Sequence, residues 1–151
     1  IHREGYDIYG RLARHLGTTP KAFSTGKNAR VASSRLAHYA YEVGEYGQAA
    51  ESLERLLAGF PKDSGYLRRA TLAQYESGGY PRALEHARTL LLGLKSGSEA
   101  WYEAKYYQLS CLFKTDRTTA EKVMRQLRLL HPDLGPPDWR DRLLELDSQT
   151  K

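Results

Sequence analysis

An internal repeat is the feature that most constrains how this chain can fold. The segment Gly-Glu-Tyr-Gly-Gln-Ala at residues 44–49 returns as Gly-Gly-Tyr-Pro-Arg-Ala at residues 78–83, so that Ala83 follows Ala49 by 34 residues. A weaker third copy at residues 115–120 places Ala120 37 residues after Ala83. Periods of this length are typical of helical arrays, in which each repeat packs mainly on its neighbours.

Glycines and prolines in these copies predict where the helices begin and end. Gly44 and Gly78 each end a first helix, because glycine adopts the left-handed conformation of a helix C-terminus without steric cost. Pro81 suits the start of a second helix, where its missing N–H does no harm. Pro61 and Pro132, 71 residues apart, fall where second helices must stop. The expected unit is therefore a helical hairpin.

Small and apolar residues recur on the second helix of each hairpin. Ala49, Ala83 and Ala120 fall in its first turns, where a small side chain allows two helices to approach closely. An i, i+3, i+4 pattern follows each alanine and predicts a buried stripe. The stripe residues are Leu53, Leu56 and Leu57, then Ala87, Leu90 and Leu91, then Met124 and Leu127.

The pattern resembles the tetratricopeptide repeat family over residues 30–134, with repeats at 30–63, 64–97 and 101–134. The resemblance implies an all-α fold, a right-handed α-α superhelix of the solenoid type. The third repeat departs most from the family, with Gln108 where a small residue is usual. The inserted residues 98–100 either precede its first helix or lengthen that helix by almost a turn, which would put Trp101 at the family's fourth place.

The two ends of the chain predict further helices, and residues 1–151 together predict one domain. Tyr9, Leu12, Ala13 and Leu16 form an amphipathic pattern that predicts a helix over residues 1–17. Residues 18–28 are polar and predict a loop. After Pro137, an apolar stripe of Trp139, Leu143 and Leu146 predicts a capping helix at 137–147, which would seal the last repeat.

No pattern of catalytic or metal-binding residues stands out. Residues 24–27, Ser-Thr-Gly-Lys, lack the earlier glycine that a phosphate-binding loop requires. The histidines never occur as an i, i+4 pair, and Cys111 is the only cysteine and lies beside Leu112, which favours an inert buried thiol. We therefore expect a protein that is not an enzyme and has no cofactor and no metal.

The resemblance implies a concave groove lined by the second, fifth, ninth and twelfth places of each repeat. A lysine–asparagine carboxylate clamp is not reproduced at these places, so we expect an internal segment of a protein or peptide partner. Residues 64–97 hold five Lys or Arg against two Glu, which favours a partner with acidic as well as apolar residues. The predicted peptide-binding residues are Ser34, His38, Tyr41, Arg68, Leu72, Tyr75, Tyr102, Lys105 and Leu109.

Two alternatives to a protein-interaction scaffold stay open. The net charge of +5 and pI of 9.3 allow a basic helical repeat that binds nucleic acid, although Lys and Arg are scattered among Asp and Glu. The chain could equally serve as an accessory domain of an enzyme. It starts at Ile1 without an initiator methionine, so we expect a piece of a longer protein.

The sequence contains no apolar run long enough to cross a bilayer. We therefore expect no membrane insertion. Cytoplasmic and periplasmic locations stay open, and so does the oligomeric state.

Overall fold

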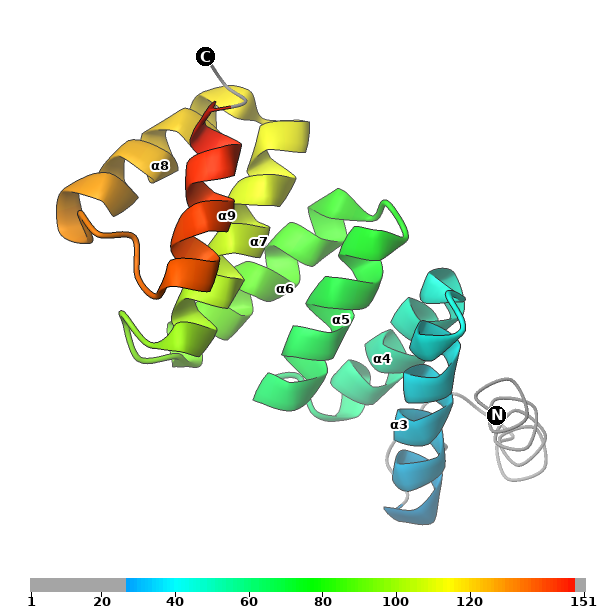
Figure 1. The fold of residues 1–151 in the computed structure, drawn as a ribbon. Helices are drawn as coiled ribbons and strands as arrows, with labels where there is room; N and C mark the ends of the chain where they lie inside the picture. The colour runs from blue at the N-terminus through cyan, green and yellow to red at the C-terminus, as the bar shows by residue number, and fades with distance from the viewer. Residues whose placement is uncertain (1–26, 149–151) are drawn as a thin grey trace. The chain divides into compact units, whose positions relative to one another are not determined.

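The computed structural model describes residues 27–148, and in this part of the chain α-helices joined by turns and short loops make up the whole fold. The helices are packed mainly against their neighbours in sequence, as Figure 1 shows. This confirms the all-α prediction. The predicted helix at 1–17 lies outside the described residues. In order the helices are α3 (Lys27–Glu42), α4 (Tyr46–Gly59), α5 (Ser64–Glu76), α6 (Tyr80–Gly93), α7 (Glu99–Thr115), α8 (Arg117–Leu130) and α9 (Pro137–Ser148).

The described residues divide into two compact units between Gly78 and Gly79. In the first unit α4 packs against both α3 and α5. In the second unit α7 packs against α6, α8 and α9. The prediction of a single domain stays a prediction. The predicted loop at 18–28 needs a correction at its end, because Lys27 and Asn28 already belong to α3.

The turn between α3 and α4 has the geometry that its glycine predicts. Gly44 has a φ of 82°, in the left-handed region. Its N–H donates to the carbonyl of Tyr41 at 3.0 Å, and the N–H of Glu45 donates to the carbonyl of Ala40 at 2.8 Å. These two bonds satisfy carbonyls at the helix end that would otherwise lack a partner. Gly78, at the end of α5, has a φ of 86°.

The recurring small residues are buried as the sequence predicts. Ala49, Ala83 and Ala120 are all 0% exposed, so each lies at a close approach between packed elements. Leu53, Leu56 and Leu57 of α4 are also buried. In the second unit the buried stripe includes Ala87, Leu90, Met124 and Leu127, whereas Leu91 is half-buried.

Of the two alternatives for the insertion in the third repeat, the structure shows the longer helix. Helix α7 begins at Glu99 and has 17 residues. Ser98 caps it, since its Oγ accepts a hydrogen bond from the N–H of Trp101 at 3.2 Å. At the other end, Asp116 alone links α7 to α8, and its carboxylate accepts from the N–H and hydroxyl of Thr119. The hydroxyl bond lowers the pKa of Asp116.

The C-terminal helix α9 returns onto α7 and closes the core of the second unit. Leu143 of α9 is fully buried in this core, with Trp139 and Leu146 packed against it, as the apolar stripe predicts. The preceding loop has an unusual conformation: Leu134 is buried with a φ of 56°, and Gly135 has a φ of 81°. A Cβ on Gly135 would lie 2.6 Å from the ring of Tyr102. Core residues of this unit are Tyr102, Leu109, Met124, Leu127, Leu134 and Leu143.

Replacing Ala49 with leucine tests the close approach in the first unit. We expect Ala49→Leu to lower the free energy of unfolding by about 1–3 kcal/mol, because the added carbons must enter a closely packed site. Ala58→Leu is the matched control, since Ala58 is exposed on the same helix. Urea denaturation measures both. Equal stability for the two variants would contradict close packing at Ala49.

A pair of glycine substitutions tests the turn. Gly44→Ala should destabilise the protein by about 1–2 kcal/mol, because an L-residue pays that cost in the left-handed region. Gly47→Ala should cause no loss, because Gly47 lies inside α4 with open space at its Cβ position. Thermal denaturation compares them. A loss at Gly47 as large as that at Gly44 would show that backbone conformation is not the cause.

Candidate functional site

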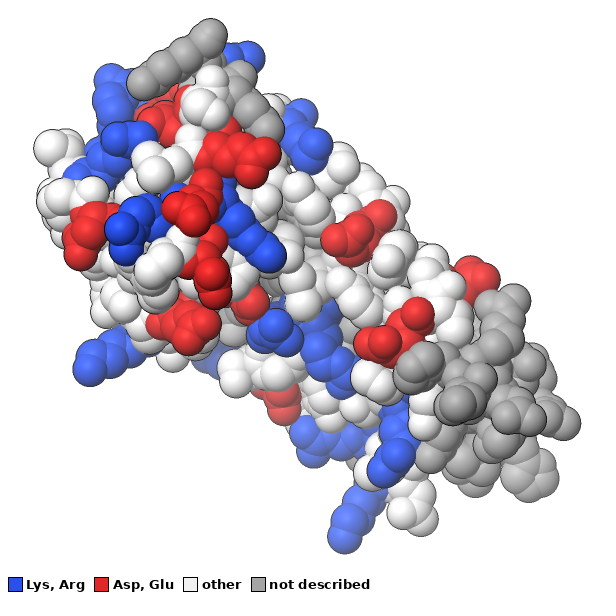
Figure 2. Space-filling model, in the orientation of Figure 1, with Lys and Arg blue, Asp and Glu red and all other residues white. Residues whose placement is uncertain are grey.

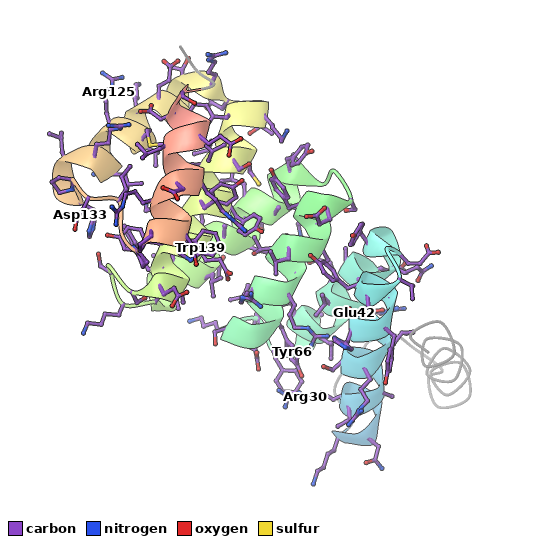
Figure 3. All side chains as sticks on the ribbon, viewed as in Figure 1. Arg30, Glu42, Tyr66, Arg125, Asp133 and Trp139 are labelled. Carbon is purple, nitrogen blue, oxygen red and sulfur yellow. The ribbon has the colours of Figure 1, made fainter. Side chains whose placement is uncertain are left out.

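Side-chain contacts join α3 and α5, which are the first helices of two successive predicted hairpins. The contacting residues are separated by a nearly constant offset in sequence. The Nε of Arg30 donates to the hydroxyl of Tyr66 at 2.6 Å, across 36 residues. Four residues further along α3, Ser34 meets Arg69 across 35 residues. Figure 3 shows Arg30 and Tyr66 reaching toward each other from α3 and α5. Because both positions advance together, the two helices run in the same direction about one repeat apart.

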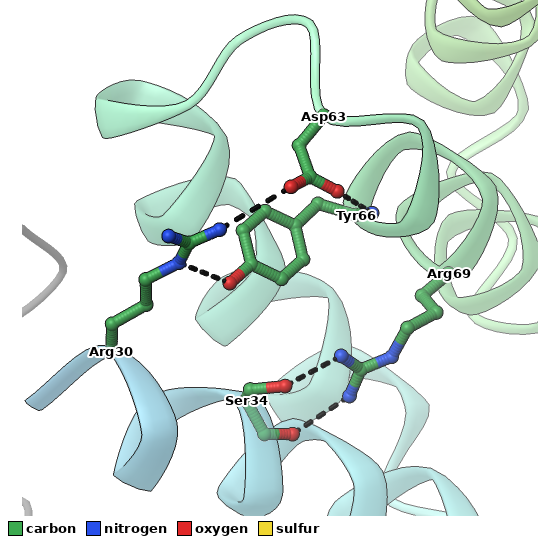
Figure 4. A network of polar contacts seen from close by, with 5 residues as sticks. All are labelled: Arg30, Ser34, Asp63, Tyr66 and Arg69. Carbon is green, nitrogen blue, oxygen red and sulfur yellow. Dashed lines mark hydrogen bonds and ion pairs between the residues drawn. The ribbon is translucent and has the colours of Figure 1, made fainter. Parts of the chain in front are cut away.

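Arg69 is held firmly at this contact, as Figure 4 shows. Its Nη1 donates to the Oγ of Ser34 at 2.8 Å, and its Nη2 donates to the Ser34 carbonyl at 2.7 Å. Burial lowers the pKa of Arg69, although a guanidinium stays charged at neutral pH. The two bonds fix the plane and position of a partly desolvated cation.

Asp63 supports the same contact from the start of α5. Its Oδ1 accepts from the N–H of Tyr66 at 3.0 Å, which caps the helix. Its Oδ2 lies 3.3 Å from the guanidinium of Arg30. That guanidinium also lies over the ring of Phe60, 3.8 Å from its centroid. The Asp63 carboxylate therefore caps the start of α5 and also pairs with Arg30 of α3.

A cleft of about 350 Å³ opens beside these contacts. Helix α3 provides one wall and α5 the other, while Leu53 of α4 contributes a buried apolar side chain. The cleft combines cationic, anionic, aromatic and aliphatic groups, so it can hold an apolar side chain and bond polar groups next to it. Its lining residues are Ala37, His38, Tyr41, Glu42, Leu53, Arg68, Arg69 and Leu72.

Four of the predicted binding residues line this cleft: His38, Tyr41, Arg68 and Leu72. Ser34 does not line it, but it lines a neighbouring hollow together with His38 and Arg69. Tyr75 is half-buried near the end of α5 and lies outside the cleft lining.

The charges along the cleft are not uniform. Burial raises the pKa of Tyr41, and the nearby carboxylate of Glu76 raises it further, while the charge of Arg68 acts in the opposite direction. Glu42 lines the cleft at the next residue of α3. Charges of both signs therefore act around Tyr41, from Glu42 and Glu76 on one side and Arg68 on the other. Arg69 adds a further cation at the end near Ser34.

The three predicted residues on α7 lie in different surroundings. Tyr102 and Leu109 are 5% and 0% exposed and belong to the core of the second unit, so they are not open to a peptide. The hydroxyl of Tyr102 pairs with Nδ1 of His131 at 3.1 Å. We leave Tyr102 and Leu109 out of the candidate site. The expectation that α5 and α7 share one trough stays a prediction.

Lys105 is half-buried on α7. Its Nζ lies 5.4 Å from the centroid of the Trp101 ring and donates to Oε1 of Gln108 at 3.1 Å. Burial lowers the pKa of the Lys105 ammonium. Trp139 of α9 is stacked similarly, with the guanidinium of Arg142 4.9 Å from its ring centroid. These cation–aromatic contacts attach polar side chains to the rim of the second unit's core.

Two important cleft residues, Arg69 and Glu42, were not among the predicted binding residues. The rule taken from the family counts the fifth and twelfth places of a repeat, whereas these two residues occupy the sixth and thirteenth. The one sequence signal for these two residues was a charged side chain in a predicted first helix. Whether such a side chain reaches the cleft depends on how α3 and α5 pack against each other, and the place rule does not describe that packing.

Two structural observations bear on chemistry. Cys111 is fully buried, and burial raises the pKa of its thiol to about 11, so the thiol stays protonated at neutral pH and is a poor nucleophile. Among residues 27–148, no cluster of three or more His, Cys, Asp or Glu side chains is arranged to hold a metal ion. Within that same range, every helix is too short or too polar to span a bilayer.

Comparisons of the chain with protein-family models, with curated proteins and with solved structures found no match.

The contact between Arg69 and Ser34 can be tested by its contribution to stability. Arg69→Met should lower the free energy of unfolding by about 1–3 kcal/mol, because two charge-assisted hydrogen bonds are lost. Ser34→Ala should cost less, about 1 kcal/mol, because the Ser34 carbonyl still accepts. Arg88→Met, at an exposed site on α6, is the control. If urea denaturation gives Arg69→Met and the Arg88→Met control the same free energy of unfolding, the contact is contradicted.

Proposed function

We propose that this chain is a tetratricopeptide-type helical repeat protein that binds a segment of a partner protein in the cleft between α3 and α5. The observation that carries the proposal is that His38, Tyr41, Arg68 and Leu72 line one cleft. These residues occupy the groove-facing places expected for successive repeats, and they come from two helices about one repeat apart. In this proposal the repeats form a right-handed superhelix.

Repeat geometry supports the assignment independently of the cleft. The offset of 35 residues between Ser34 and Arg69 is close to the 34-residue spacing of Ala49 and Ala83. The left-handed glycines Gly44 and Gly78 occur at the same spacing. The offset of the side-chain pairing, the spacing of the buried alanines and the spacing of the turn glycines are thus nearly equal, as expected for stacked hairpins.

The chemistry of the cleft suits a peptide better than a small metabolite. Leu72 is half-buried and offers apolar surface, the buried Leu53 closes the lining behind α3 and α5, and Tyr41 offers an aromatic ring with a hydroxyl. Arg68 and Glu42 add charges of both signs. A partner segment contains these same complementary groups along one chain, and helical repeats usually bind extended or helical segments.

The charge distribution favours a protein partner over nucleic acid. Figure 2 shows Lys and Arg interspersed with Asp and Glu over the face of α9. Glu42 lines the cleft itself, where a phosphate backbone would be repelled. We also propose that the chain is not a catalyst, since the buried, protonated Cys111 offers no ready nucleophile.

Charge reversal in the cleft tests the proposal. Short random peptides displayed on phage would be selected against the full chain, resynthesised and measured by calorimetry. Arg68→Glu should weaken binding of the selected peptides about tenfold, because a reversed charge in the cleft repels acidic ligand groups. Arg88→Glu is the matched control, because Arg88 is exposed on α6 and does not line the cleft.

Circular dichroism would establish that both variants are folded. Equal losses for Arg68→Glu and Arg88→Glu, or a loss at Arg88 alone, would refute binding at this cleft. A single-stranded oligonucleotide measured beside the selected peptides at low and high salt separates the two partner classes. Contacts to a phosphate backbone weaken steeply as salt rises, whereas a mixed peptide interface should respond only modestly.

A further inference from the structure

A second hollow adjoins the cleft on the first unit. It is lined by Ser34, Arg35, His38, Tyr39 and Arg69, and it is more open to solvent than the cleft. His38 and Arg69 line both spaces, so a ligand could occupy the two together. Any occupant of the hollow would therefore be a direct neighbour of the group held in the cleft.

The lining of the hollow suits an anion. It contains two guanidinium groups, an imidazole and two hydroxyls, and no carboxylate. Asp63 contributes the main carboxylate charge that acts on Arg69, and Asp63 already pairs with Arg30. By contrast, Glu42 lines the cleft and Glu76 acts on Tyr41. In the lining of these two spaces the carboxylate thus lies toward the end of α3, where Arg68 also acts, whereas the hollow is lined by cationic and neutral side chains.

Arg69 is already positioned for such a contact. Its two bonds to Ser34 fix the guanidinium before any ligand arrives, so little side-chain entropy remains to be lost on binding. A guanidinium has five N–H donors in a planar fork, which allows it to bond further acceptors. Carboxylate and phosphate oxygens match that fork. Arg35 adds a second such group from α3.

We propose that the hollow binds an anionic side chain, a carboxylate or a phosphate, belonging to the same partner segment whose apolar side chain enters the cleft. This inference rests on the proposed function. It also orients the segment: the anionic residue lies toward Ser34, and any basic residue lies toward Glu42. The recognition motif is therefore an anionic residue close in sequence to a large apolar residue.

Arrays of short synthetic peptides would test this motif. Each peptide has a leucine at its centre and, at a nearby position on either side, phosphoserine, glutamate, serine or lysine, with all other positions randomised. Labelled full-length chain should bind the phosphoserine or glutamate arrays about tenfold better than the serine arrays, with lysine weakest. The phosphoserine and glutamate arms distinguish the two sources of negative charge.

Variants locate the anion contact. Arg35→Ala should reduce the preference for anionic over serine arrays to about threefold or less, while binding to the serine arrays stays unchanged. Arg69→Lys keeps the charge but loses the fork, and should reduce the same preference. Lys62→Ala, at an exposed lysine between α4 and α5, is the control and should keep the full preference.

The outcomes separate this inference from the proposed function. If the serine arrays bind and the anionic arrays bind no better, the hollow does not recognise an anion, although the cleft still binds peptides. A full preference in both Arg35→Ala and Arg69→Lys would likewise overturn the inference. If the labelled folded chain binds no array more strongly than the same chain denatured in urea does, both the proposed function and this inference fail.

Discussion

The position of α4 determines how the two walls of the cleft are held in the first unit. This helix packs against both α3 and α5, and Ala49, at 0% exposed, allows a close approach in its first turn. Helices α3 and α5 are thereby held side by side on a common support. Leu53 of α4 lines the cleft between them. A larger residue than Ala49 would move α4 outward and alter the spacing of the cleft walls.

Polar contacts then fix the two walls relative to each other. Arg30 and Arg69 reach between α3 and α5 at two successive positions, and both are bonded at well-defined acceptors. Partly buried guanidinium groups are costly to desolvate unless they are paired, so these arginines favour one register of the two helices. Arg69 also lines both the cleft and the hollow. The structural contact and the proposed recognition therefore depend on one side chain.

Local chemistry explains what could be predicted from the sequence. Gly44 and Gly78 take left-handed conformations, and Ala49, Ala83 and Ala120 are buried, because each of these roles depends on backbone sterics or side-chain size at one position. Four cleft residues followed from their repeat places in α3 and α5. The pairing of Ser34 with Arg69 did not, because it depends on which side chains of two separate helices meet.

On α7 the same place rule selects two buried residues, for a reason that lies elsewhere in the chain. Tyr102 and Leu109 are buried because α9 returns onto α7 and brings Leu143 into the core. That return passes through Leu134, which is buried with a positive φ, and through Gly135, whose missing Cβ leaves room for the ring of Tyr102. Leucine is a poor choice for a left-handed conformation by local propensity, so tertiary packing must offset the strain. Leu134 is the last residue of the third predicted repeat and Gly135 follows it, and neither is part of the short motif that recurs. The exposed face of α7 therefore depends on the loop that leads into α9. It could not be assigned from the repeat pattern without knowing the conformation of that loop.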